Sequence, residues 1–168
     1  MVCGPPIQRK GHSEAMNRAM ADRINAVAPG FLQELQASSS PEPENLQRLW
    51  DLMKQVRSGP GGLRTMRGQP WQSPNERPER VAAVFQRAMQ SQGDWDWRED
   101  AKRATSPALF VHGDADFLPV EAAEEWAEYL PNARVFRMTD VGHFPSLEKP
   151  ELFFSALEQF LCGRWPVA

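Results

Sequence analysis

Apolar residues in the first half of the chain recur at helical spacing, which predicts amphipathic helices. A first helix runs from Glu14 to Val27, with Ser13 as its N-cap, and Pro29-Gly30 ends it. A short helical piece follows at residues 31–35, and a linker rich in serine and proline covers 38–43. Two further apolar stripes predict the remaining helices: Leu46, Leu49, Trp50, Met53 and Val56, then Val81, Val84, Phe85, Ala88 and Met89 after Pro78. Residues 13–93 should therefore be helical, without a strand.

The second half changes to a pattern of short buried strands. Ala108-Leu109-Phe110-Val111 is an apolar run that ends in the turn Gly113-Asp114-Ala115-Asp116, closed by Pro119. A helical segment separates it from a second run at residues 134–138, and the loop after that run contains His143. Pro150 opens a last helix whose apolar face should lie on a sheet, and that face consists of Leu152, Phe153, Ala156, Leu157, Phe160 and Leu161.

Asp116 and His143 each follow one of the two predicted strands. A helical crossover returns the chain in the same direction, so the strands should be parallel and end at the same edge of the sheet. That edge is where α/β sheets bind ligands and do chemistry. The pattern therefore predicts an α/β fold in which this carboxylate and this imidazole lie side by side.

Composition narrows the possible partners. The chain has 168 residues, 41% of them hydrophobic, which suits one domain with a substantial core. A net charge of −3 with interspersed signs offers no basic face for nucleic acid or for a membrane surface, and no apolar run approaches the length of a membrane span. We expect a cytoplasmic protein that binds neither nucleic acid nor membrane.

Nothing in the sequence indicates a cofactor or a metal. Cys3 and Cys162 lie near opposite ends and match no metal-binding spacing, so both are expected to be reduced thiols. No glycine-rich phosphate loop and no metal cluster occurs, and no cofactor is predicted. Trp95 and Trp97 could line a substrate pocket or pack the junction between the helical part and the sheet, and we favour packing.

Two segments carry a resemblance to a known family. Residues 106–119 resemble the acid-bearing strand 7 of the α/β-hydrolase superfamily, and residues 142–150 look like its histidine loop and the start of its final helix. The approach at residues 94–98 is similar to that of proline iminopeptidase-like hydrolases. The family carries its catalytic residues in the order nucleophile, acid, histidine. The resemblance implies that Asp116 is the acid and His143 the base.

The chemistry explains these residue types. A histidine can take a proton from a hydroxyl and return it to a leaving group near neutral pH, and a buried carboxylate on its far nitrogen fixes the tautomer. Either residue alone could have a simpler role, with Asp116 capping its turn and His143 serving as an ordinary loop histidine. Asp114 is the lesser candidate acid and is expected to be an Asx-type turn residue. His12 and His112 are expected to make local polar contacts.

The nucleophile is the missing part. The family places it in a Gly-x-Ser-x-Gly elbow between a buried strand and a helix, and the nearest match is Gly11-His12-Ser13-Glu14-Ala15. No buried strand precedes Ser13, which makes it a weak candidate. Ser58 has Val56 and Pro60 where the elbow needs glycines, and Cys3 is followed by Gly4-Pro5-Pro6, which cannot propagate a helix.

An alignment with the family predicts only part of its fold. Residues 1–12 would be the end of a core strand and a lead-in loop, 13–93 a helical cap, and 94–168 the C-terminal part of the core, with the N-terminal half of the sheet missing. Val2-Cys3 looks like the tail of strand 6, so we expect a start internal to a longer ancestral gene. An exposed strand edge would then invite a second chain or self-association.

Three functions remain open at this point. The chain could be a truncated hydrolase with little activity alone, whose intact relative cleaves an ester, amide or related bond of a small molecule through a serine. It could be one half of an enzyme completed by another chain. It could also be a non-catalytic interaction module that binds through its helical cap.

Overall fold

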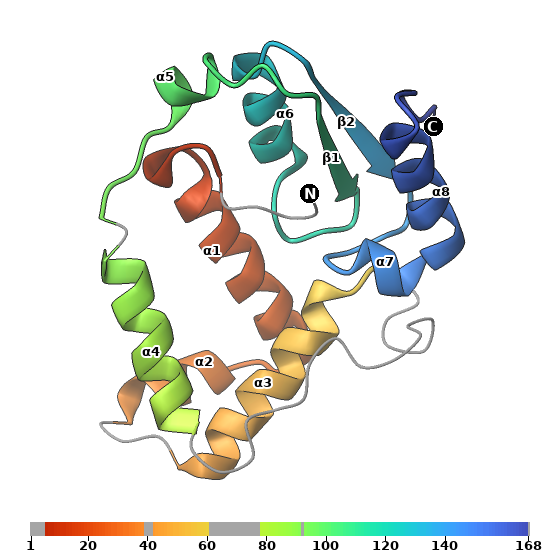
Figure 1. Ribbon diagram of the computed structural model, residues 1–168. Helices are drawn as coiled ribbons and strands as arrows, with labels where there is room; N and C mark the ends of the chain where they lie inside the picture. Colours follow the sequence, from red (N-terminus) through yellow and green to blue (C-terminus); the bar gives the residue numbers. More distant parts are fainter. Residues whose placement is uncertain (1–5, 39–41, 61–77, 92, 168) are drawn as a thin grey trace.

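The computed structural model describes residues 6–38, 42–60, 78–91 and 93–167 (Figure 1). The elements run in the order α1 Arg9–Val27, α2 Phe31–Ala37, α3 Pro43–Arg57, α4 Pro78–Ser91, α5 Arg98–Ala101, β1 Ala108–Gly113, α6 Val120–Tyr129, β2 Ala133–Met138, α7 Pro145–Glu148 and α8 Pro150–Leu161. Helices α1 to α4 therefore precede both strands. The predicted strand end at Val2-Cys3 and the segment 61–77 lie outside the described residues.

The two strands form a parallel pair, as predicted. Ala108 pairs with Ala133 and Gly113 with Met138, so the strands are in register along their whole length. Helix α6 makes the crossover between them. Within the described residues this is a partial α/β fold, and its strands end together at one edge.

Each face of the strand pair is covered by one helix (Figure 1). Leu109, Val111, Phe136 and Met138 share one face and form a buried cluster with residues of α8. On the other face, Phe110 stacks on Trp126 of α6 with ring centroids 6.2 Å apart. Both strands therefore lie between helices, which explains the nearly continuous apolar sequence of β1. In β2 the apolar residues are interrupted by Arg134 and Arg137.

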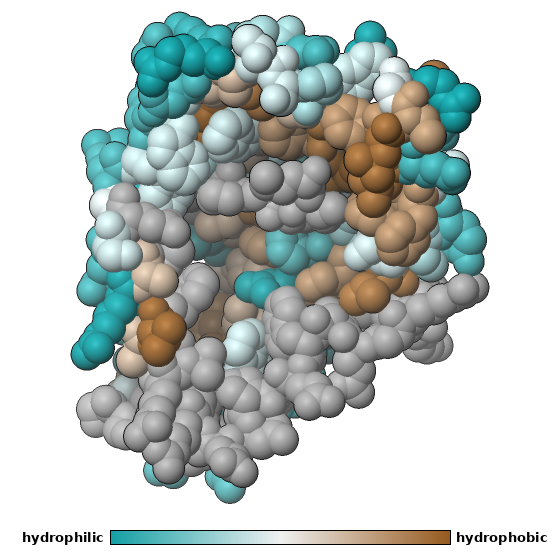
Figure 2. All heavy atoms as spheres, in the orientation of Figure 1, coloured by the Kyte–Doolittle hydropathy of each residue, from teal (hydrophilic) through white to brown (hydrophobic). Residues whose placement is uncertain are grey.

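Helix α8 buries less of its apolar surface than the sequence predicts. Phe153 and Ala156 are buried in the sheet cluster, and Leu157 and Phe160 pack against it. Leu161, in contrast, is 74% exposed. An apolar patch is visible over α8 on the right of the molecule in Figure 2. Four of the six predicted apolar residues of α8 thus pack in the sheet cluster, whereas Leu152 and Leu161 are exposed, because the described sheet has two strands for α8 to cover.

The helical region has a core of its own, formed by Ile24 and Ala28 at the end of α1, Phe31 of α2 and Val56 of α3. Helix α1 starts earlier than predicted, at Arg9, with Gln8 at the N-cap position. The assignment of Ser13 as N-cap is therefore wrong. Backbone contacts explain the earlier start, since Arg9 N–H donates to the Trp95 carbonyl at 2.9 Å and Gln8 bridges Asp96.

Helix α4 forms where Pro78 predicts it, but its apolar stripe is not buried along its length. Val84 is 68% exposed, and Ala88 is exposed as well. The side chains of Val81, Phe85 and Met89 lie outside what the structure describes. The prediction of the helix is confirmed, and Val84 and Ala88 of its apolar stripe are exposed to solvent.

The two tryptophans pack the junction, as predicted. Trp95 is buried and stacks on Trp97 with centroids 5.7 Å apart, and its indole N–H donates to the Pro6 carbonyl at 3.0 Å. Trp97 continues the contact to Trp126 of α6. Across the described residues, every helix is too short or too polar to cross a bilayer.

Candidate active site

The structure brings Asp116 and His143 together at the ends of the two strands. Nδ1 of His143 lies 3.1 and 3.0 Å from the two carboxylate oxygens of Asp116. An ionised carboxylate only accepts hydrogen bonds, so Nδ1 must donate and Nε2 becomes the basic nitrogen. The Asp116 side chain is fully buried, and the His143 side chain is 19% exposed. The predicted juxtaposition is confirmed.

Aromatic rings surround the imidazole. The Phe117 ring lies 4.8 Å from the His143 ring, and Phe144 meets it edge-on at 5.3 Å. The Arg57 guanidinium lies over the Phe117 ring, 5.3 Å from its centroid. Burial lowers the pKa of Arg57, and the charge of Asp116 opposes that shift. The pair thus sits in an apolar setting next to a partly buried cation.

Backbone hydrogen bonds join the acid turn to the histidine loop. Ala115 N–H donates to the Val141 carbonyl at 2.9 Å, and Asp140 N–H donates to Oδ1 of Asp114 at 2.7 Å. Asp114 therefore links two loops, where the sequence predicted a local Asx turn. His143 N–H donates to the Arg57 carbonyl at 2.7 Å, which ties the loop to the end of α3.

Two glycines allow these loops to approach so closely. A Cβ on Gly113 would lie 2.0 Å from the Val141 carbonyl oxygen, and one on Gly142 would lie 2.3 Å from the Arg57 carbonyl oxygen. Both neighbours are backbone atoms that cannot rotate away. Only residues without a side chain fit at these positions.

Two charged residues near the site were missed by the sequence analysis. Arg23 of α1 donates to the carbonyls of Val56, Ala115 and Asp116 at 2.8–3.1 Å. Glu148, 8% exposed, accepts backbone hydrogen bonds near His143. Their partners are backbone groups distant in sequence, so spacing could not reveal them. The one available signal was the position of Glu148 two residues before Pro150, which opens α8.

None of the nucleophile candidates gains support from the structure. Ser13 lies inside α1, and the residue before that helix, Gln8, forms only an isolated antiparallel bridge with Asp96. The strand-to-helix elbow is thus not formed there. The Ser58 hydroxyl donates to the Lys54 carbonyl at 3.1 Å. Cys3 lies outside the described residues.

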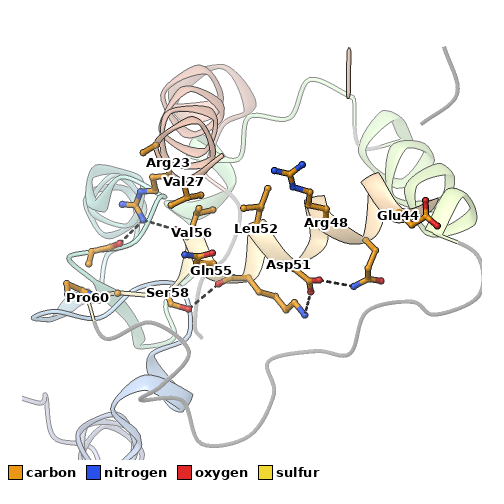
Figure 3. Close-up of a pocket in the computed structure, with 15 residues that line it drawn as sticks. Arg23, Val27, Glu44, Arg48, Asp51, Leu52, Gln55, Val56, Ser58 and Pro60 are labelled. Carbon is orange, nitrogen blue, oxygen red and sulfur yellow. Dashed lines mark hydrogen bonds and ion pairs between the residues drawn. The ribbon is translucent and has the colours of Figure 1, made fainter. Parts of the chain in front are cut away.

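A cavity of about 1270 Å³ opens between α1 and α3, beside this site (Figure 3). Its walls combine charged residues such as Arg23 and Arg48 with the apolar Leu52 and Val56. It reaches Ala115, the residue before the acid, although neither Asp116 nor His143 lines it. The cavity therefore lies next to the pair of Asp116 and His143, and neither residue forms part of its wall.

The other histidines lie elsewhere. His112 is buried with Nδ1 at 2.8 Å from the Gly113 carbonyl, which confirms a local contact. His12 makes a long-range one instead: its Nε2 lies 3.0 Å from Oε2 of Glu125 on α6. In the part of the chain that the structure covers, no three potential ligands gather into a metal site. Cys162 is exposed as a free thiol.

Comparison with protein families supports the assignment suggested by the motifs. The model of the "Alpha/beta hydrolase family" matches residues 6–156, which is most of the chain. A pimeloyl-[acyl-carrier protein] methyl ester esterase of Aromatoleum aromaticum is 44% identical over 59 residues, covering 34% of this chain and 24% of the esterase. A putative esterase/lipase of Haemophilus influenzae is 33% identical over 67 residues, 39% of this chain and 23% of that protein.

Solved structures agree on the fold. Proline iminopeptidase from Mycobacterium smegmatis superposes with a TM-score of 0.59 at 18% identity, covering 96% of this chain and 55% of that one. VinJ gives a TM-score of 0.60, also at 18% identity, over 94% and 55% of the two chains. The chain thus spans about a quarter of its curated relatives and about half of these solved proteins.

Proposed function

Because the chain belongs to the alpha/beta hydrolase family, we propose that it supplies the acid and the general base of a serine-type hydrolase that cleaves carboxylic esters. The observation that supports this is the hydrogen-bonded pair of Asp116 and His143 at neighbouring strand ends. The preference for esters rests on the relatives named as methyl ester esterase and esterase/lipase.

In the proposed reaction, Nε2 of His143 takes the proton of an attacking serine hydroxyl as the serine oxygen bonds to the ester carbonyl carbon. The same proton passes to the alkoxide oxygen as the carbon–oxygen bond breaks, and an alcohol leaves. A water molecule then repeats the sequence on the acyl-enzyme and releases the carboxylic acid. Asp116 holds the imidazole in the required tautomer and stabilises the imidazolium formed at each step.

The proposal assigns no nucleophile among the described residues. Ser13 is embedded in a helix, and Ser58 donates its hydroxyl to a helix carbonyl. We therefore expect slow hydrolysis by the chain alone, in which Nε2 of His143 takes the proton of a water molecule that attacks the ester carbonyl directly. A second polypeptide that brings a Gly-x-Ser-x-Gly elbow and an oxyanion hole should raise the rate, by on the order of 10²–10³ for one oxyanion donor.

Release of nitrophenol from p-nitrophenyl butyrate by the purified chain tests this proposal. His143→Ala should lower the rate by about tenfold or more, because general-base catalysis is lost. Ser13→Ala should leave it unchanged, and so should His12→Ala, a matched control in the other histidine–carboxylate pair. Equal rates for wild type and His143→Ala would refute the general base. Loss of activity in Ser13→Ala would instead identify that serine as the nucleophile.

A further inference from the structure

The carboxylate of Glu148 is an acceptor for three backbone amides from two different loops. Oε2 accepts from Gly59 N–H at 2.8 Å and from Gly142 N–H at 2.9 Å. Oε1 accepts from Phe144 N–H at 3.0 Å. The residue is 8% exposed, so these bonds form largely out of water. Hydrogen bonds to an ionised acceptor are stronger than neutral ones, and more so in a desolvated setting.

The three amides surround His143. Gly142 and Phe144 are its two neighbours along the chain, and both N–H groups point at the same carboxylate. The His143 N–H itself donates to the Arg57 carbonyl at 2.7 Å. All three successive amides of this loop segment are thus bound, which fixes the direction in which the His143 side chain leaves the backbone.

The third amide belongs to the helical region. Gly59 follows the end of α3, and a Cβ at this position would lie 2.9 Å from Oε2 of Glu148 and 2.9 Å from Gly142 N. The close approach leaves no room for a side chain between the α3 loop and the histidine loop. Glu148 therefore joins the helical region to the loop that carries the imidazole.

We propose that Glu148 is a positioning residue that holds His143 in hydrogen-bonding contact with Asp116. The same carboxylate holds Gly59, in the loop after α3, against the histidine loop. This assignment rests on the proposed function for the meaning of the pair, but the geometry it predicts can be measured without turnover. This role differs from that of a negative charge near the start of α8, which would stabilise the helix without affecting the imidazole.

Nuclear magnetic resonance of the ¹⁵N-labelled full chain provides the test, with the His143 signals assigned from His143→Gln. In the wild type, the imidazole should carry its proton on Nδ1 as a single tautomer. In Glu148→Gln, the amide group must face at least one backbone N–H that it cannot accept from. We expect exchange of the Nδ1 proton with water to accelerate by about tenfold or more, because a charge-assisted network is broken.

Glu158→Gln is the matched control, since Glu158 is exposed on α8 and carries the same charge. It should leave the His143 exchange rate within about twofold of wild type, as surface substitutions usually have small effects. The His12 signals should not change in either variant and report that the fold persists. Glu148→Asp, which keeps the charge but is shorter, should give an intermediate exchange rate and replaces Glu148→Gln if that variant does not fold.

A Glu148 variant that is less stable but has wild-type His143 signals would overturn the proposal and leave Glu148 as a structural residue only. That result is distinguishable from failure of the proposed function, which would appear as ester hydrolysis unaffected by His143→Ala. A faster-exchanging His143 proton in Glu148→Gln, with His12 unchanged, supports the positioning role whether or not the chain turns over an ester.

Discussion

Two histidine–carboxylate pairs among the described residues have the same separation but lie in different surroundings. His143 lies 3.0 Å from Asp116, and His12 lies 3.0 Å from Glu125. The side chains of the second pair are 21% and 16% exposed, whereas that of Asp116 is fully buried. Distance alone therefore does not distinguish a structural pair from a chemical one.

The two pairs differ in the structural elements on which their residues lie. His12 and Glu125 project from helices α1 and α6, and Gln8 shares the carboxylate at 2.6 Å, so the pair joins two helices. Asp116 and His143 follow parallel strands, on loops whose backbones are bonded to each other. Ends of parallel strands are where α/β folds position reacting groups. Geometry becomes evidence of chemistry only with this placement.

The first prediction breaks the strand-end pair through the backbone. Gly113→Ala should place a methyl group 2.0 Å from the Val141 carbonyl oxygen and force the histidine loop away from the acid turn. We expect a loss of about 3 kcal/mol in the free energy of unfolding, typical of severe overpacking. Urea denaturation measures it.

Gly11→Ala is the control next to the helical pair. The nearest neighbours of its new Cβ would be atoms of the flexible Gln8 side chain, at 3.1 Å. Alanine is also the better helix former, so the change in unfolding free energy should stay within about 1 kcal/mol of zero. Equal destabilisation by the two alanines would show that the strand-end loops are not packed as described.

The second prediction compares the carboxylates directly. Asp116→Ala leaves the His143 Nδ1–H and the Leu118 N–H, which donates to Oδ1 at 3.1 Å, without their acceptor. We expect a loss of about 2 kcal/mol in unfolding free energy, because buried bonds to a charged group are broken. Thermal and urea unfolding monitored by circular dichroism measure the loss.

Glu125→Ala provides the other half of that comparison. The pair it breaks is partly exposed, so the loss should be about 1 kcal/mol or less. Ester hydrolysis should fall in Asp116→Ala and stay at the wild-type rate in Glu125→Ala. The reverse order, in stability or in rate, would contradict the distinction between the two pairs.

Local sequence signals were enough to predict the strand-end pair. Two short strand patterns, one ended by a Gly-Asp turn and one by a Gly-His loop, predicted β1 and β2. They also predicted that Asp116 meets His143, because a crossover connection returns the chain in the same direction. Helices α1 to α4 were likewise indicated by their periodicity. What these signals share is that each feature is encoded within a few neighbouring residues.

Features that depend on partners far away in the sequence could not be predicted from it. Helix α1 starts at Arg9 because Trp95 accepts its N–H, and no cap residue near Ser13 could reveal that. Glu148 and Arg23 bind backbone groups that carry no sequence signature. His12 contacts Glu125, which lies more than a hundred positions away in the sequence, so the prediction of a local contact for His12 was wrong.

The third prediction concerns Arg23, which lies on the same helix as His12 but binds the backbone of the turn that carries Asp116. Its guanidinium donates to the carbonyls of Val56, Ala115 and Asp116 and so connects α1, α3 and the acid turn. Arg23→Met keeps much of the volume and removes the donors. We expect a loss of about 1 to 2 kcal/mol in unfolding free energy, with the His143 imidazole signals shifted and those of His12 unchanged. A change confined to His12 would place the effect in α1 alone.

The smallest expected effect is a dependence of stability on pH through Asp96. This residue forms a backbone bridge with Gln8, next to the pair of His12 and Glu125. Hydrogen bonds from Arg98 lower the pKa of Asp96 from 3.8 to about 2. A carboxylate whose pKa is lower in the folded state contributes stability above its unfolded pKa and loses that contribution as the pH falls through the folded value. Asp96→Asn should therefore unfold at a slightly lower temperature than wild type at pH 5, and the difference should vanish between about pH 4 and 2. If the difference in unfolding temperature persisted at pH 2, the Asp96 charge would not be its source. If the His143 signals shifted over the same pH range, Asp96 and the strand-end pair would be coupled.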